Sequence, residues 1–243
     1  MINVTRDERV VTVAIDVPPV NVLDAAALTE LNEALLELAG DGSIAAVLLM
    51  GAGRCFSAGA SVEDHEKSRA PGMIAALADV CKTLAELPMA TVAMVHGPCM
   101  GGGLEVALFC DFIVADPGAK FGVPEITLAF FPPFACYRLP SLTGRQNAAY
   151  LALTGETIEV PAAQAMGLVQ KVAEKEEWGR VERRFNHLSL PVVRMTKLAL
   201  RKGRTEGLEA QTDLFLGPLY EIEDLQEGIA SFAEKRRPEW KHR

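Results

Sequence analysis

Apolar residues follow a strand-like pattern at the start of the chain and a helical pattern soon afterwards. The β-branched runs INVT and VVTVAI flank the polar RDER between residues 2 and 16, which predicts a hairpin of two strands. Four leucines then recur at helical spacing from residue 28 to residue 38. They lie between Asp24, a residue type that favours helix caps, and Gly40, so an amphipathic helix is predicted there.

Strands and helices alternate over the next stretch of the chain. The predicted elements, in order, are the buried strand AAVLLMG, the helix GMIAALADVCKTLAEL, the strand TVAMVHG, a glycine turn with a short helix, and the strand DFIVAD. Such alternation predicts an α/β fold with a largely parallel sheet. From about Gly144 the pattern is helical, through NAAYLALTG, PAAQAMG, VVRMTKLALRKG and the stretch from Glu206 to Lys235. The last third is therefore predicted to be a helical extension.

Length and composition favour one main domain. With 243 residues, 49% of them hydrophobic, the chain can bury a substantial core. The net charge of −8 and the pI near 5.1 argue against binding to nucleic acid or to an anionic membrane surface. No charged leader precedes a long apolar stretch, and no segment reaches the ~20 apolar residues of a membrane span, so we expect a cytoplasmic protein. The five cysteines show no CxxC spacing and are expected to be reduced.

Two segments share a design in which an apolar strand runs into a small-residue turn and then a helix: VLLMGAGRCFSAGAS and TVAMVHGPCMGGGLEVA. Glycine permits sharp turns and close approach of a ligand, and the first amides of a helix are unpaired donors. Two such donors aimed at one oxygen form an oxyanion hole, which contributes about 3 to 4 kcal/mol per donor. A purely structural role in tight turns explains either segment alone equally well. The spacing is not GxGxxG, which argues against a dinucleotide site.

Two glutamates are candidates for proton transfer. Glu105 follows Gly103 at a predicted helix start among apolar neighbours, where a carboxylate is costly unless it is partnered or functional. Glu125, in KFGVPEITLAF, is expected at a strand or loop end facing a cavity. Two carboxylates around one water can act as base and acid if their pKa values differ. A helix-start charge and a solvated turn residue are the structural alternatives.

With these residues the chain resembles the crotonase, or enoyl-CoA hydratase/isomerase, superfamily over essentially its whole length. The resemblance lies in ordered segments: PVNVLDAAALTELNEAL, CFSAGAS, VHGPCMGGGLEVALFCDFIVAD, KFGVPEITL, LTGETIEVPAAQAMGLVQKV and FAEKRRPEWKHR. It implies a spiral of ββα units, residues 1–190, followed by a C-terminal helical trimerisation region, residues 191–243, within the same structural unit. A homotrimer or homohexamer is expected.

The resemblance also assigns roles to residues. The backbone amides of Ala58 and Gly102 would bind the thioester oxygen, and Glu105 and Glu125 would stand where hydratases keep two catalytic glutamates. Neighbouring Ser57, Ala60 and Gly101 are candidate substrate contacts. For the phosphates of coenzyme A, which enters as part of the acyl-CoA substrate rather than as a cofactor, the candidate basic residues are Arg54, Lys235, Arg236, Arg237 and Lys241.

The chain departs from the family in two places. Ser61 replaces the usual aspartate and can still cap the next helix. AFFPPFACYRL replaces a glycine-rich segment common in hydratases of straight-chain substrates. We expect Phe131 and Phe134 to wall a rigid acyl pocket, and Phe130 to pack in the core. The segment resembles hydratases of cyclic dienoyl-CoA thioesters, which makes this subtype an alternative.

These observations favour an enoyl-CoA hydratase that adds water across the 2,3-double bond through an oxyanion-stabilised enolate. Alternatives are a cyclohexa-1,5-diene-1-carbonyl-CoA-type hydratase, an isomerase or acyl-CoA hydrolase using the same site, and a non-catalytic acyl-CoA binding subunit. The four histidines have no spacing suited to a metal site, so we expect no bound metal.

Overall fold

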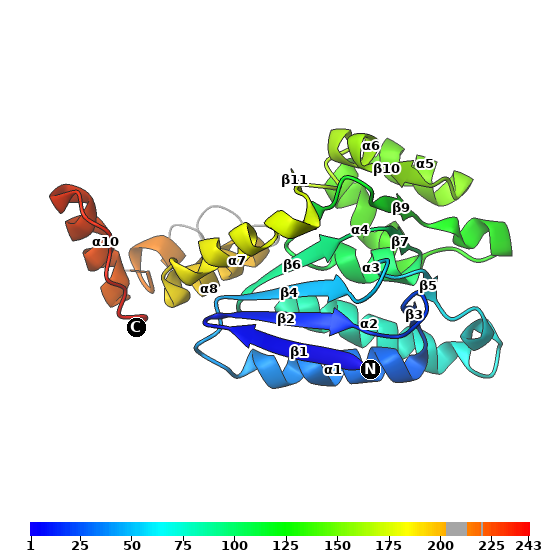
Figure 1. Cartoon of the computed structure of the whole chain (residues 1–243), viewed down its shortest axis with the longest axis horizontal. Coiled ribbons are helices and arrows are strands. Elements are labelled where there is room, and N and C mark those ends of the chain that lie inside the picture. The colour runs from blue at the N-terminus through cyan, green and yellow to red at the C-terminus, as the bar shows by residue number, and fades with distance from the viewer. Residues whose placement is uncertain (203–212, 220) are drawn as a thin grey trace.

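The core of the protein is a six-stranded sheet in the order β1-β2-β4-β6-β8-β11 (Figure 1). The computed structural model describes residues 1–202, 213–219 and 221–243. The hairpin of β1 and β2 is antiparallel, as predicted, and the remaining neighbours are parallel. The strands are β1 Ile2–Asp7, β2 Val10–Ile15, β4 Ala46–Gly51, β6 Ala90–Val95, β8 Phe112–Ala115 and β11 Lys171–Val172.

Short strands form a second layer beside this sheet. Strand β3 (Val22–Leu23) pairs with β5 (Gly59–Ala60), and β9 (Lys120–Gly122) lies between β7 (Pro98–Met100) and β10 (Ile158–Glu159). Each turn of the chain places one strand in the large sheet, one short strand in the second layer, and then a helix. The predicted spiral of ββα units is thereby confirmed.

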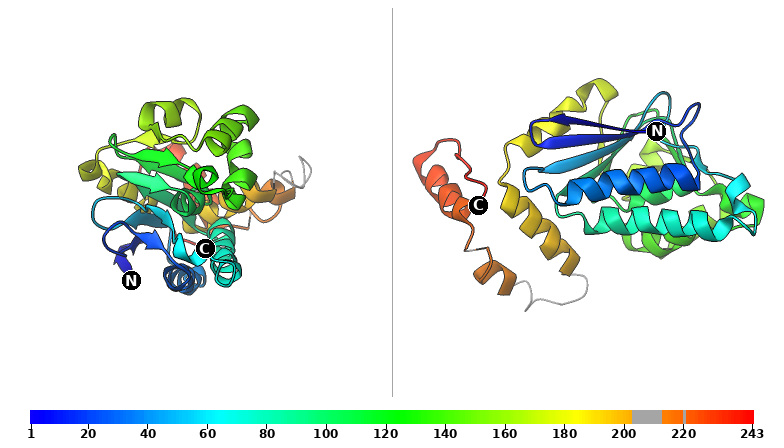
Figure 2. Two further views of the ribbon diagram at one scale, coloured as in Figure 1. Left: turned by 90° about the vertical axis from the view of Figure 1, so that its right-hand side faces the viewer. Right: turned by 90° about the horizontal axis from the view of Figure 1, so that it is seen from below.

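Helices cover the sheet, and α1 and α2 pack side by side along one face (Figure 2). Asp24 caps α1, because its carboxylate accepts a hydrogen bond from the Ala27 amide at 2.7 Å. The helices are α1 Ala25–Ala39, α2 Ala70–Glu86, α3 Gly102–Leu108, α4 Pro133–Thr143, α5 Arg145–Thr154, α6 Val160–Ala165, α7 Gly179–Asn186, α8 Leu190–Lys202 and α10 Glu223–Glu234. Single 3-10 turns are η1 Glu63–His65, η2 Pro124–Leu128 and η3 Lys175–Glu177.

Side chains along each central strand point alternately to the two faces of the sheet. Both faces are covered, so these strands are apolar throughout. In β4, Val47 and Leu49 join the large core under α1 and α2, whereas Leu48 faces the opposite side. There it packs in a smaller cluster with Trp178 and Val181, near the start of α7. Both faces are therefore removed from water, as the uninterrupted apolar run predicted.

The C-terminal helices extend away from the end of the molecule that carries α3 and β5 (Figure 1). Helix α8 begins at Leu190, next to the boundary expected between core and extension. Of the predicted helical stretch 206–235, residues 206–212 and 220 lie outside the described residues, and α10 confirms its last part. Within the described part of the chain, none of the helices has the length and apolar character that crossing a membrane requires.

Candidate active site

A cavity of about 280 Å³ lies where the two glycine turns meet α2, η2 and the segment before α4. Both glutamates reach it, although they come from separate elements, α3 and η2. The sequence alone did not establish this meeting. The lining residues are Ala60, His65, Ala70, Met73, Ile74, Leu77, Gly102, Glu105, Glu125, Phe130, Phe131 and Pro133.

Glu105 is almost fully buried, with 2% of its surface exposed. Its Oε1 accepts hydrogen bonds from the backbone amides of Phe134 at 2.8 Å and Ala135 at 2.9 Å. These amides belong to the first turn of α4, where a helix has unpaired donors. Burial raises the pKa of Glu105 to about 7, and repulsion from Glu125 adds to the rise, whereas the two amides oppose it. The side chain can therefore hold or release a proton near neutral pH.

Glu125 lies in η2 rather than at the strand or loop end that we expected. Burial raises its pKa, while its own amide and His65 lower it. Its Oε2 is buried and has no hydrogen-bond partner among the described residues. Its Oε1 lies so close to Gly101 that a Cβ there would approach it to 2.7 Å, and Gly101 has φ of 48°. Both facts require glycine at position 101.

The first of the two proposed amide donors needs correction. The Ala58 amide donates to the Val20 carbonyl at 2.9 Å and is therefore not available to a ligand. The Ser61 amide donates to Leu23 of β3, and peptide directions alternate along an extended strand, so the Ala60 amide points away from β3. A Cβ placed on Gly102 would lie 3.1 Å from the Ala60 nitrogen. Ala60 and Gly102 are thus the adjacent pair of small residues in the cavity wall.

The other candidates in the first turn have different positions. Ser57 is fully buried, and its hydroxyl donates to the Asn21 carbonyl at 2.6 Å and accepts from the Gly59 amide at 3.1 Å. It stabilises the turn and does not face the cavity, which corrects its expected contact with substrate. Arg54 is exposed and lies outside the cavity lining. The Ser61 hydroxyl accepts from the Asp64 amide at 3.3 Å, but the cap residue of η1 is Val62, so the expected capping role of Ser61 was wrong.

The three phenylalanines of residues 130–134 do not take the positions that we expected. Phe131 lines the cavity with 68% of its surface exposed, but Phe134 packs against the core and contributes only its amide to the site. Phe130, expected in the core, lines the cavity instead and contacts the ring of His65, with the centroids 4.7 Å apart. Sequence reasoning missed His65 as a site residue. Its place four residues after Ser61, directly beyond the first small-residue turn, was the available signal.

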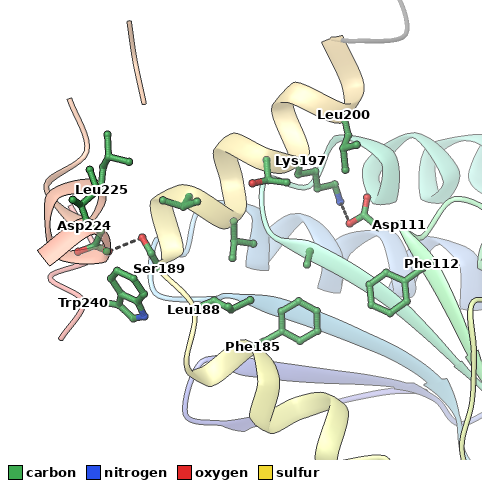
Figure 3. Close-up of a pocket in the computed structure, with 16 residues that line it drawn as sticks. Asp111, Phe112, Phe185, Leu188, Ser189, Lys197, Leu200, Asp224, Leu225 and Trp240 are labelled. Carbon is green, nitrogen blue, oxygen red and sulfur yellow. Dashed lines mark hydrogen bonds and ion pairs between the residues drawn. The ribbon is translucent and has the colours of Figure 1, made fainter. Parts of the chain in front are cut away.

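A larger apolar cavity of about 870 Å³ lies elsewhere, between the sheet and the C-terminal helices (Figure 3). Lys197 on α8 reaches Asp111 there at 3.0 Å, and Ser189 donates to Asp224 of α10 at 2.6 Å. The first interaction ties α8 to the residue before β8, and the second ties the start of α8 to α10. The polar side chains of this cavity therefore hold the C-terminal helices in place.

The basic C-terminal residues are partly committed to contacts within the chain. The Arg236 guanidinium donates to Glu227 at 2.9 Å and to Glu234 at 2.6 Å, whereas Lys235 and Lys241 are exposed. Arg237 lines a separate polar cavity that also includes Arg9. In the described residues, no three His, Cys, Asp or Glu side chains gather closely enough to hold a metal ion.

Comparison with known proteins places this site in a family. The family model for enoyl-CoA hydratase/isomerase matches residues 5–243. A probable enoyl-CoA hydratase of Rhizobium meliloti is 35% identical, covering 92% of this chain and 90% of that protein. A cyclohexa-1,5-dienecarbonyl-CoA hydratase of Thauera aromatica is 31% identical, covering 98% and 95%. The crystal structure of an enoyl-CoA hydratase from Bacillus anthracis superposes with a TM-score of 0.91 at 29% identity, covering 100% of this chain and 99% of that one.

The chain therefore belongs to the enoyl-CoA hydratase/isomerase family and has the crotonase fold.

Proposed function

We propose that this enzyme adds water across the 2,3-double bond of an acyl-CoA thioester. The observation that carries the proposal is the presence of Glu105 and Glu125 in one cavity beside the small-residue turns. A water held between the two carboxylates would attack the β-carbon as a proton reaches the α-carbon. The names of the Rhizobium meliloti and Thauera aromatica relatives, both hydratases, agree with this reaction.

Stabilisation of the thioester enolate is assigned to the amides of Ala60 and Gly102. Gly102 is the first residue of α3, so its N–H has no partner within the helix. Ala60 replaces Ala58 in this role, because the Ala58 amide is occupied. Two preorganised donors lower the barrier by about 3 to 4 kcal/mol each when they face the developing negative charge. The chemistry uses no cofactor, since coenzyme A arrives as part of the substrate.

The test is the hydration of crotonyl-CoA, which is measured as the loss of the absorbance of the conjugated enoyl thioester. Glu105→Gln and Glu125→Gln should each lower kcat by about 100-fold or more, because each removes a proton-transfer group without changing side-chain volume. Nearly full activity in either variant would contradict the two-glutamate mechanism. Products without an added hydroxyl would instead identify an isomerase, and release of free coenzyme A a hydrolase. Normal acyl-CoA binding without turnover of any thioester would identify a binding subunit.

A cyclic dienoyl-CoA thioester is the second candidate substrate. The named activity of the Thauera aromatica relative and the aromatic wall of Phe130 and Phe131 favour it. A flat ring stacks on aromatic faces with little loss of conformational freedom. A preference for crotonyl-CoA over cyclohexadienoyl-CoA of about tenfold, or about 1.4 kcal/mol, would exclude this subtype.

We further propose that the protein assembles as a homotrimer or homohexamer through its C-terminal helices. The 870 Å³ cavity beside α8 and α10 is lined mainly by apolar side chains, and two of them, Leu200 and Ile229, are 68% and 56% exposed. Exposed apolar surface of this extent is typical of subunit interfaces.

A further inference from the structure

A buried asparagine, Asn21, lies behind the turn 52–58 that joins β4 to β5. It belongs to the loop between β2 and β3, and only 3% of its surface is exposed. Its backbone has φ of 56°, a left-handed conformation that asparagine tolerates better than most residues. Asn21 does not line the cavity that holds the two glutamates, so it is not itself a catalytic residue. The proposed mechanism assigns it no part.

The carboxamide of Asn21 holds the curl of this turn. Its Nδ2 lies 2.9 Å from the Ala52 carbonyl oxygen, 2.9 Å from that of Cys55 and 3.2 Å from that of Phe56. Its Oδ1 accepts from the Val17 amide at 2.9 Å. An amide N–H can only donate and a carbonyl oxygen can only accept, so these partners distinguish the two ends of the carboxamide. One side-chain nitrogen therefore gathers three carbonyls of a single turn.

The backbone of Asn21 is tied to the same turn through Ser57. The Ser57 hydroxyl donates to the Asn21 carbonyl at 2.6 Å and accepts from the Gly59 amide at 3.1 Å. Gly59 is the residue before Ala60, so this chain of hydrogen bonds ends one peptide before the Ala60 amide. The loop that carries Asn21 is thereby connected to the proposed oxyanion donor.

The neighbours of Asn21 in the loop hold the strand that follows the turn. The Val20 carbonyl accepts from the Ala58 amide at 2.9 Å, and the Leu23 carbonyl accepts from the Ser61 amide at 2.9 Å. Because peptide directions alternate along an extended strand, the Ala60 amide points away from this segment. The segment 20–23 therefore determines which amide of the strand faces the cavity.

We infer that Asn21 is a positioning residue for the oxyanion hole, and that it fixes the direction of the Ala60 amide through the turn 52–58. The inference rests on the proposed function, because that function gives the Ala60 amide a thioester oxygen to bind. Oxyanion donors are effective when they are already aimed at the developing charge. A turn whose carbonyls lose their common donor relaxes, and the amide at its end then loses its aim. Asn21 thus supports catalysis without contacting the substrate.

The test measures how strongly the carbonyl of a bound thioester is polarised. Butyryl-CoA labelled with ¹³C at the carbonyl carbon has no 2,3-double bond, so it occupies the site without being hydrated. Infrared difference spectra against unlabelled butyryl-CoA isolate the C=O stretch, which moves to lower frequency when two amides donate to the oxygen. Asn21→Gly keeps the left-handed backbone and removes the carboxamide. At full occupancy this variant should lose about half or more of the wild-type shift.

Kinetics with crotonyl-CoA provide a second measurement on the same variant. In Asn21→Gly, kcat should fall by about 10- to 100-fold while KM stays within about threefold of the wild-type value. This loss is smaller than the roughly 100- to 1,000-fold cost of deleting an oxyanion donor, because the Ala60 amide is misdirected rather than absent. A merely structural role would lower the amount of folded protein and leave the carbonyl stretch of the bound ligand unchanged.

A second variant and a matched control complete the experiment. Ser57→Ala removes the hydroxyl that joins the Asn21 carbonyl to the Gly59 amide, so it should move the carbonyl stretch in the same direction. It decides the question if Asn21→Gly does not fold. Asn186→Gly is the control, because Asn186 Oδ1 accepts from the Arg9 amide at 3.3 Å and the residue lies outside the cavity lining. Its carbonyl stretch and kcat should match those of wild type.

The outcomes separate this inference from the proposed function. An unchanged carbonyl stretch in folded Asn21→Gly or folded Ser57→Ala overturns the inference and leaves the proposed function standing, and so does an equal change in Asn186→Gly. A wild-type complex whose carbonyl stretches as it does in water would remove the Ala60 and Gly102 amides from their assigned role, and the inference with them.

Discussion

At the scale of single residues, Glu105 combines a place in the candidate active site with an unfavourable location for a charge. The pKa of its carboxyl rises from 4.5 to about 7 because burial penalises the ionised form. Between these values the folded protein keeps a proton that the unfolded chain has released. The penalty is therefore absent below pH 4.5, grows as pH rises, and is complete above pH 7.

Replacing this carboxyl with an amide should stabilise the protein at neutral pH. Glu105→Gln keeps an oxygen that can accept from the amides of Phe134 and Ala135 and removes the buried charge. Its free energy of unfolding at pH 8 should exceed that of wild type by about 1 to 3 kcal/mol, and the difference should shrink toward zero near pH 4.5. Urea unfolding at several pH values measures this. A difference that stays constant with pH would show that the charge is not its cause.

Single positions were also where sequence reasoning succeeded least. Glu105, Glu125 and Gly102 could be selected from motif context, and all three line the cavity. Whether the amide of Ala58 or that of Ala60 is the available donor depends on which peptide nitrogen pairs with a neighbouring segment of the chain. The spacing of residues in the sequence carries no such information. His65 and Glu125 line the same cavity from positions 60 residues apart in the chain, and sequence spacing carries no information about that meeting.

At the scale of elements, the predicted strands and helices agree closely with the structure, because each had a clear period and an end signal. The α1 helix runs from the residue after Asp24 to the residue before Gly40. The 3-10 turn η2 was missed, since a five-residue turn beginning at a proline has no repeating apolar pattern. The segment AFFPPFACYRL, expected only to wall a pocket, also starts a helix, because Pro133 begins α4 at a position where a proline is favoured.

The attachment of α8 to the sheet should depend on an ion pair between the buried Lys197 and the partly exposed Asp111. The Lys197 ammonium lies 3.0 Å from Asp111, 3.0 Å from the Met89 carbonyl and 3.2 Å from the Thr91 hydroxyl. Lys197→Met leaves the Asp111 carboxylate, whose side chain is only 30% exposed, without its cation. We expect a loss of about 2 to 3 kcal/mol in the free energy of unfolding, below the value for a fully buried pair.

Thermal denaturation of Lys197→Met, Asp111→Asn and the double variant measures this coupling. The double variant should recover part of the loss, because the unpaired charge is then absent. Strictly additive losses would mean that the two side chains stabilise the protein independently.

At the scale of the whole molecule, the site and the C-terminal helices lie at opposite ends (Figure 1). The distal apolar cavity is about three times the volume of the cavity that holds both glutamates, about 870 against 280 Å³, and neither glutamate lines it. Volume alone would therefore have misplaced the active site. The convergence of small residues and carboxylates, visible in the sequence, was the better guide.

Subunit assembly should be sensitive to charge at this distal surface. Leu200→Asp introduces a carboxylate at the edge of the apolar cavity, where burial against another subunit would be costly. Sedimentation velocity should show a shift from the oligomer toward monomer. Leu36→Asp, on the outer side of α1 where the side chain is 54% exposed, is the matched control and should leave the sedimentation coefficient unchanged. An intact oligomer in Leu200→Asp would place the interface elsewhere.

The two amide contacts of Glu105 Oε1 also have a consequence for substrate selection. One carboxyl oxygen accepts from the backbone that begins α4, which leaves the second oxygen for the proton transfer that we propose. The same backbone follows directly after Phe131 and Pro133, which line the cavity. A shift of the 131–135 backbone would also move Glu105, whereas Met73, Ile74 and Leu77 of α2 line the same cavity and hold neither glutamate. If the proposed function holds, changes of acyl specificity should therefore be reached more readily at these three positions.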